Sequence, residues 1–97
     1  MEFEVKNINK SINDLMRTIG YQPTYLQNDG EFSVVRKLTG NDYPRFHLYV
    51  KQRDKDFIFN LHLDQKKPSY EGSTGHSGEY DGELVEGEAG RIKDLLV

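Results

Sequence analysis

Two runs of alternating apolar and polar residues between Arg45 and Asp64 constrain the fold more than any other feature of this sequence. Strict alternation places every second side chain on the same face of a β-strand, so each run predicts a strand with one apolar face. If Asp54 and Lys55 form the turn between them, the apolar side chains of both strands share a face. The pattern therefore predicts an antiparallel hairpin. Its apolar members are Phe46, Leu48, Val50, Phe57, Phe59, Leu61 and Leu63.

The same register predicts which polar side chains meet on the other face of this hairpin. His47 is expected opposite His62, and cross-strand partners of this kind have Cβ atoms about 5 Å apart. The other expected polar pairs are Tyr49 with Asn60 and Arg45 with Asp64.

Helical periodicity occurs near both ends of the chain. From about Asn9 to Ile19, apolar residues recur every three or four positions, which predicts an amphipathic helix. Asn7 or Asn9 is expected to cap its start and Gly20 to end it. A second apolar stripe follows Asp81, the expected cap of a C-terminal helix.

Two shorter extended segments are expected between the first helix and the long hairpin. Residues 24–27 and 31–38 flank Asn28-Asp29-Gly30, whose residues tolerate the positive φ angles of a tight turn. We therefore expect a first hairpin here, preceding the second.

These elements predict an α+β fold with two layers. An antiparallel sheet of three or four strands is expected to carry the N-terminal and the C-terminal helix on one face, in the order α-β-β-β-β-α. Residues 1–97 are expected to form a single domain, because a chain of 97 residues has room for one core. The Gly- and Ser-rich segment 65–82 has no apolar period and predicts a long loop.

Composition excludes several classes of site and partner. The chain has no cysteine, which rules out disulfides, thiolate metal sites and a cysteine nucleophile. A net charge of −3 without a long basic run argues against nucleic acid as the partner. No apolar run reaches the roughly 20 residues of a membrane-spanning helix, and no signal-peptide pattern is visible. We expect a cytoplasmic protein with no membrane partner.

The histidines suggest two kinds of chemistry. His47, His62 and Asp64 are the candidate catalytic residues, because imidazoles beside a carboxylate can perform general acid–base work on an ester or phosphodiester. His47 and His62 are also candidate metal ligands, together with His76 and Glu79 of the loop. Ordering that loop would cost on the order of 1–2 kcal/mol per residue. We therefore expect at most weak metal binding and no resident cofactor.

No catalytic, metal-binding or nucleotide-binding motif is complete in this sequence. The leading hypothesis is a small non-catalytic binding module that engages a protein partner or a second copy of itself through the polar sheet face and the 65–82 loop. One alternative is a small hydrolase or ribonuclease-like protein that uses His47 and His62, and another is a weak metal-binding protein. The candidate binding residues are Tyr49, Asn60, Tyr70, His76 and Tyr80.

Overall fold

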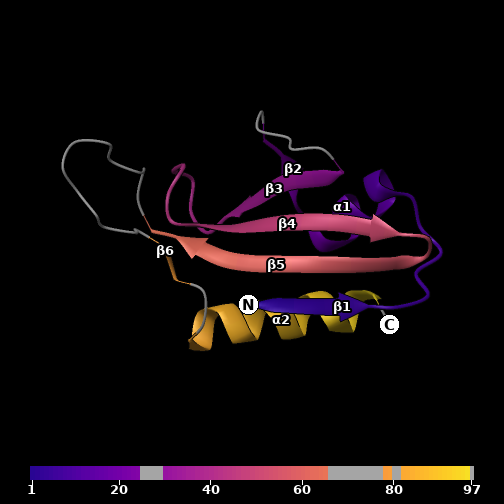
Figure 1. Cartoon of the computed structure of the whole chain (residues 1–97). Coiled ribbons are helices and arrows are strands. Elements are labelled where there is room, and N and C mark those ends of the chain that lie inside the picture. Colours follow the sequence, from indigo (N-terminus) through magenta and orange to yellow (C-terminus); the bar gives the residue numbers. More distant parts are fainter. Residues whose placement is uncertain (25–29, 66–77, 80–81, 97) are drawn as a thin grey trace.

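The computed structural model describes residues 1–24, 30–65, 78–79 and 82–96 (Figure 1). Five strands form one antiparallel sheet in the order β1-β5-β4-β3-β2, and a sixth, β6, also pairs with β5. The strands are β1 (Glu2–Val5), β2 (Gln22–Pro23), β3 (Glu31–Lys37), β4 (Arg45–Arg53), β5 (Asp56–Asp64) and β6 (Gly78–Glu79). The helices are α1 (Ile12–Ile19) and α2 (Glu83–Leu96). An α+β fold with an antiparallel sheet and two helices is therefore confirmed.

The β4–β5 hairpin has the predicted register throughout. Its apolar pairs are Phe46 with Leu63, Leu48 with Leu61 and Val50 with Phe59, and its polar pairs are His47 with His62, Tyr49 with Asn60 and Arg45 with Asp64. Asp54 begins the turn with a φ of 56°. Because a slip of one residue would turn every apolar side chain away from the core, the alternation alone specifies this register.

The expected order α-β-β-β-β-α is wrong, because a strand precedes the first helix. β1 pairs with β5, and Phe3 stacks on Phe59 with 5.1 Å between ring centroids. Its sequence does alternate, but four residues are fewer than the five or six of a typical strand and carry little signal. The sheet therefore exceeds the expected three or four strands, and β6 lies within the segment expected to be a loop.

α1 is shorter than its apolar stripe suggests. It begins at Ile12 and is capped by Ser11, whose Oγ accepts a hydrogen bond of 3.2 Å from the backbone N–H of Asp14. The expected caps Asn7 and Asn9 lie before this start. Gly20 ends the helix in the left-handed conformation, as predicted, with a φ of 83°.

The first hairpin differs from its prediction in its first strand. β2 pairs with β3 through Gln22 opposite Val35 and Pro23 opposite Val34, so it lies before the expected segment 24–27. Of that segment, the structure describes Thr24, whose N–H donates to the carbonyl of Ser33 at 2.9 Å. Pro23 is tolerated because β2 is at the edge of the sheet, where a missing N–H removes no ladder bond.

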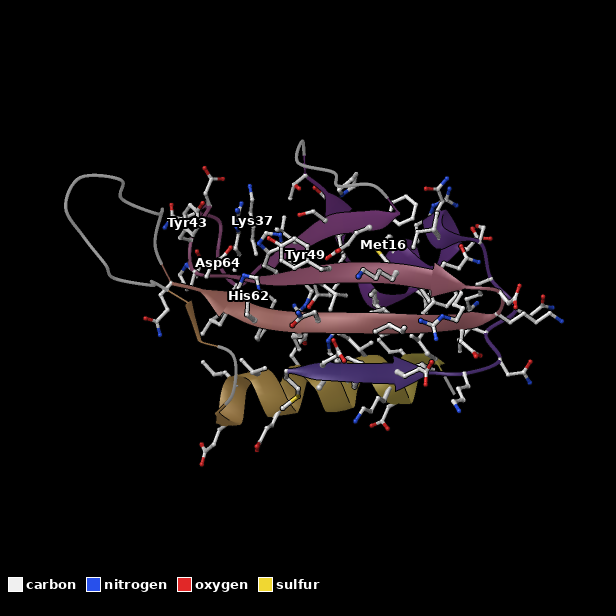
Figure 2. All side chains as sticks on the ribbon, viewed as in Figure 1. Met16, Lys37, Tyr43, Tyr49, His62 and Asp64 are labelled. Atoms are coloured by element: carbon white, nitrogen blue, oxygen red, sulfur yellow. The ribbon has the colours of Figure 1, made fainter. Side chains whose placement is uncertain are left out.

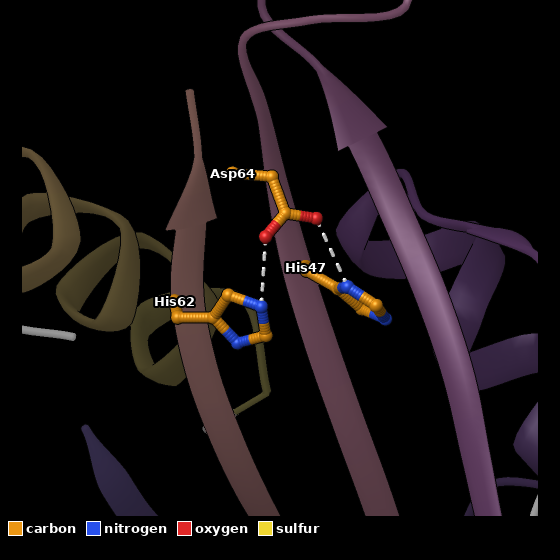
Figure 3. Close-up of side chains that lie close together, drawn as sticks. All are labelled: His47, His62 and Asp64. Carbon is orange, nitrogen blue, oxygen red and sulfur yellow. Dashed lines mark hydrogen bonds and ion pairs between the residues drawn. The ribbon is translucent and has the colours of Figure 1, made fainter. Parts of the chain in front are cut away.

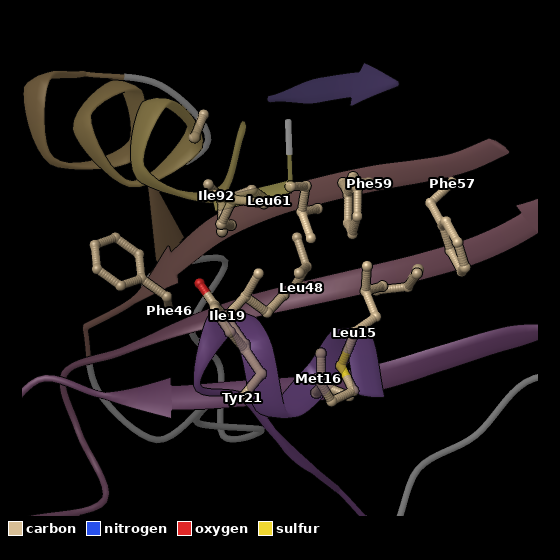
Figure 4. Close-up of a cluster of buried hydrophobic side chains, with 14 of the residues drawn as sticks. Leu15, Met16, Ile19, Tyr21, Phe46, Leu48, Phe57, Phe59, Leu61 and Ile92 are labelled. Atoms are coloured by element: carbon tan, nitrogen blue, oxygen red, sulfur yellow. The ribbon is translucent and has the colours of Figure 1, made fainter. Parts of the chain in front are cut away.

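Side chains from both helices and from one face of the sheet form a single core (Figure 4). Ile12 packs against this core but is only partly buried, whereas Leu15, Ile19, Ile92 and Leu96 of the two helices are buried. Neither helix has the length and apolar character needed to cross a membrane. The largest fully buried side chains include Phe57, Phe59, Leu15, Ile19, Leu48, Leu61 and Ile92.

One carboxylate lies inside this core. Glu88 of α2 is 4% exposed and accepts hydrogen bonds from Arg91 at 2.7 Å, Arg36 at 3.0 Å and the Tyr21 hydroxyl at 2.6 Å. Burial by itself would raise the pKa of Glu88, but hydrogen bonds from Arg91, Arg36 and Tyr21 outweigh it and lower the pKa from 4.5 to about 2. The buried charge is thus fully partnered.

Candidate functional site on the outer face of the sheet

The candidate residues lie on the side of β3, β4 and β5 that faces away from the core, which we call the outer face. Alternation along β4 and β5 places His47, Tyr49, His62 and Asp64 there, and Figure 2 shows three of them along these strands. His47 and His62 are each only 7% exposed, although neither helix packs on this face among the described residues. Their burial by neighbouring side chains gives the two imidazoles fixed surroundings.

Asp64 bridges the two imidazoles (Figure 3). Its Oδ1 lies 2.9 Å from Nε2 of His62, and its Oδ2 lies 3.1 Å from Nδ1 of His47. Nε of Arg45 approaches Oδ2 at 3.3 Å. Residues from two adjacent strands therefore converge on one carboxylate.

Asp64 is held in its ionised form. Burial by itself would raise the pKa of its carboxyl, but the hydrogen bonds from His47 and His62 outweigh burial and hold the pKa well below its usual range. An ionised carboxylate can only accept hydrogen bonds, so Nδ1 of His47 and Nε2 of His62 are assigned the donating protons. The pair of imidazoles thus directs two N–H groups at one anion.

A chain of hydrogen bonds continues from His47 across β3. Nε2 of His47 lies 2.6 Å from Oγ of Ser33, which itself accepts from the hydroxyl of Thr24 at 2.9 Å. Since Nδ1 of a neutral His47 carries the proton, Nε2 accepts from the Ser33 hydroxyl. Ser33, His47 and Asp64 therefore stand in the order nucleophile, base and orienting carboxylate that hydrolases use.

Tyr49 covers one side of this cluster. Its ring stacks on His47 with 4.5 Å between centroids and on His62 with 5.7 Å, while the two imidazoles lie 4.8 Å apart. These contacts restrict the rings as well as shield them from water. We conclude that the three aromatic side chains form one packed unit.

Next to Tyr49 the outer face is hollowed. This outer-face hollow encloses about 180 Å³. Apolar and polar atoms of Tyr49, Ile58 and Asn60 form part of its lining. Charged residues complete it, and the whole lining is Glu2, Glu31, Tyr49, Lys51, Arg53, Ile58 and Asn60. Lys51 and Glu31 approach each other at 3.8 Å across it.

The structure brings together the site residues expected on the strands. His47, His62 and Asp64 are in contact, and Tyr49 and Asn60 are paired beside them. The expected binding residues Tyr70, His76 and Tyr80 lie outside the described residues. The backbone of Glu79 pairs with Leu63, whereas the side chain of Glu79 is not among the described parts of the structure.

Sequence reasoning missed Ser33. Its place beside His47 depends on the register between β3 and β4, which pairs Ser33 with Tyr49 and Val35 with His47. A serine between Phe32 and Val34 was the available signal, since it puts a hydroxyl on the outer face.

These side chains can act chemically in three ways. The two imidazole N–H groups can bind an anion, the hydrogen bonds from Ser33 through His47 to Asp64 can pass a proton, and the imidazole nitrogens and carboxylate oxygens can be ligands of a cation.

Comparisons of the chain with protein-family models, with curated proteins and with solved structures found no match.

Proposed function

We propose that this chain is a non-catalytic binding module that engages a protein partner through the outer face of its sheet. The outer-face hollow is the observation that carries this proposal. Tyr49 and Ile58 offer aromatic and aliphatic surface, and Asn60 offers amide hydrogen bonds, while charged side chains surround them. Protein interfaces combine an apolar, aromatic centre with a polar rim in the same way.

The charges favour a polypeptide over other partners. Glu2 and Glu31 would repel the phosphates of a nucleic acid, whereas a protein surface can offer cations to them and carboxylates to Lys51 and Arg53. The volume of about 180 Å³ is also below the roughly 300–1,000 Å³ typical of small-molecule sites. A side chain of a partner protein is therefore the best fit.

Residues 65–82 extend the proposed surface on sequence grounds. They follow the end of β5 that carries His62 and Asp64. Tyr70 and Tyr80 are of the type enriched at interfaces. The partner can be a second copy of the chain, because the hollow offers charges of both signs.

The test compares retention of a partner by matched variants. Tyr49→Ala is expected to lower capture of a partner from host lysate by about 30-fold, since a tyrosine at the centre of an interface commonly contributes about 2 kcal/mol or more. Leu95→Ala is the control, because Leu95 is 44% exposed on α2, away from the outer face. Self-association is followed by light scattering of the same variants. Equal capture and equal mass in both variants would refute a binding role for the outer face.

A hydrolase is the second candidate, and the hydrogen bonds from Ser33 through His47 to Asp64 favour it. Ser33 is 3% exposed, however, and its hydroxyl is engaged by Thr24 and His47. Binding therefore ranks first, although Ser33 helps to line a separate cavity of about 320 Å³ beside α1. Turnover of chromogenic esters or RNA that disappears in both Ser33→Ala and His47→Ala would reverse this ranking.

A further inference from the structure

We propose that His47, His62 and Asp64 bind one divalent transition-metal ion, with Zn²⁺ as the best fit. One donor atom from each residue lies within 4.8 Å of the others. The donors are Nδ1 of His47, Nε2 of His62 and a carboxylate oxygen of Asp64. The three ligands do not line the outer-face hollow but adjoin it, because Tyr49 lines the hollow and stacks on both imidazoles.

The chemistry of the donors selects the class of ion. Two imidazole nitrogens and one carboxylate oxygen form a ligand set found with zinc and with non-haem iron. Mg²⁺ and Ca²⁺ prefer all-oxygen sites, so they fit poorly. Three protein ligands also leave a position for water on a four-coordinate ion.

All three ligands come from paired strands. The sequence expectation of weak binding depended on His76 or Glu79 completing the site from the 65–82 loop. In the structure Asp64 lies between the imidazoles, so β4 and β5 supply three ligands together. Binding of the ion by these three ligands therefore does not require a loop to become ordered, and the corresponding loss of conformational entropy does not weaken it.

The required movement is small. Bonds of about 2.0–2.1 Å to a tetrahedral ion place neighbouring donors roughly 3.3 Å apart, so the three atoms must approach one another by at most about 1.5 Å. Rotation of the imidazole and carboxylate groups can supply this. The ion would replace the two N–H protons that now bind the Asp64 carboxylate.

Ser33 fixes the orientation of the His47 ring through the ring nitrogen that does not face Asp64. A ligating histidine usually has its other ring nitrogen fixed by a hydrogen bond, and Oγ of Ser33 lies 2.6 Å from Nε2 of His47. A hydroxyl can donate or accept, so Ser33 can bind His47 in either tautomer. When Nδ1 binds the ion, Nε2–H would donate to Ser33. Ser33 is thus a positioning residue.

Among the described residues, Arg45 is the one whose guanidinium contacts Asp64. It approaches Oδ2, whereas Oδ1 binds His62, so an ion on Oδ1 leaves the arginine in place. The guanidinium also lies 4.5 Å from the centre of the Tyr43 ring. Arg45→Gln should therefore preserve zinc binding or strengthen it, whereas an anion site would lose affinity.

Calorimetric titration of the full chain with ZnCl₂ near neutral pH tests the site. One ion per chain is expected. Asp64→Asn and His62→Ala should each weaken binding by more than 10-fold, and Ser33→Ala by about 10-fold as an outer partner. Glu86→Gln, which removes an exposed carboxylate on α2, is the control and should change nothing. Absence of binding, or binding that survives loss of all three ligands, would overturn the proposal.

Imidazole ¹⁵N spectra of the unmutated protein test the same site without relying on variants, which can fail to fold. The chain has three histidines, so ¹⁵N imidazole spectra can be assigned to each. Zinc is expected to move the proton of His47 from Nδ1 to Nε2 and to perturb His62. A spectrum in which zinc changes only His76 would place the ion elsewhere and reject the site.

Discussion

The hydroxyl of Tyr21 donates a hydrogen bond of 2.6 Å to Oε2 of Glu88, although the two residues are 67 positions apart in the sequence. Arg91 binds the same carboxylate and also donates to the carbonyl of Ile19 at 2.6 Å. Arg36 of β3 completes the set. One carboxylate thereby joins the end of α1, the sheet and α2.

Glu88→Gln should destabilise the fold by about 2–3 kcal/mol, because it removes the buried anion that partners the half-buried Arg36 and Arg91. Chemical denaturation measures the loss. Glu86→Gln on the exposed side of the same helix is the control and should stay within about 0.5 kcal/mol of the unmutated protein. Similar values for the two variants would show that the buried network adds no stability.

Tyr21 should ionise only at very high pH. Burial and then the hydrogen bond to Glu88 raise the pKa of its hydroxyl above the ordinary value. Ultraviolet titration of the folded protein should therefore show a tyrosine that stays neutral until the chain unfolds, and Tyr21→Phe should remove that late step. A titration unaffected by Tyr21→Phe would contradict the burial.

Acid should weaken the fold through Glu88. Its pKa falls from 4.5 to about 2 on folding, so the unfolded chain binds more protons in this range. The stabilisation is complete above about pH 4.5 and is lost as the pH falls toward 2, with a total on the order of 3 kcal/mol. Asp64, whose pKa is also lowered, adds to the loss in the same direction. Urea denaturation at several pH values measures this slope, which Glu88→Gln should reduce.

Phe59→Ala should cost about 3–5 kcal/mol, because the ring is fully buried in the core and stacks on Phe3 and Phe57. Leu84→Ala is the matched control, since Leu84 is 58% exposed on α2. Thermal melts of the two variants separate the effect of burial from that of losing an apolar residue. Equal melting temperatures would mean that the apolar face of the sheet had been misassigned.

The long hairpin could be predicted because alternation, turn position and burial agree at every pair from Arg45 to Asp64. β1 could not be predicted, since its four residues form a strand only because they pair with β5, which is distant in the sequence. The same applies to the buried network. Arg36 visibly interrupts an apolar face, but its partner Glu88 is 52 positions away and local patterns carry no information about such contacts.

For the candidate site, sequence predicted that His47 and His62 face each other, because that follows from strand pairing. The bridging position of Asp64 depends on side-chain rotamers, which periodicity does not determine. Ser33 required the β3–β4 register, and that register depends on a strand whose apolar face is interrupted.

The two strands that carry the candidate ligands are neighbours along the chain, which affects the order of folding. Arg45 and Asp64, at the open end of the hairpin, are 19 positions apart, whereas Met1 and Leu61 are 60 apart. Closing the longer loop costs about 1 kcal/mol more in conformational free energy, so the hairpin should form before β1 joins it.

Val50→Ala should then slow refolding, while Val5→Ala should mainly speed unfolding. His47, His62 and Asp64 would thus meet early, and zinc present during refolding should accelerate it.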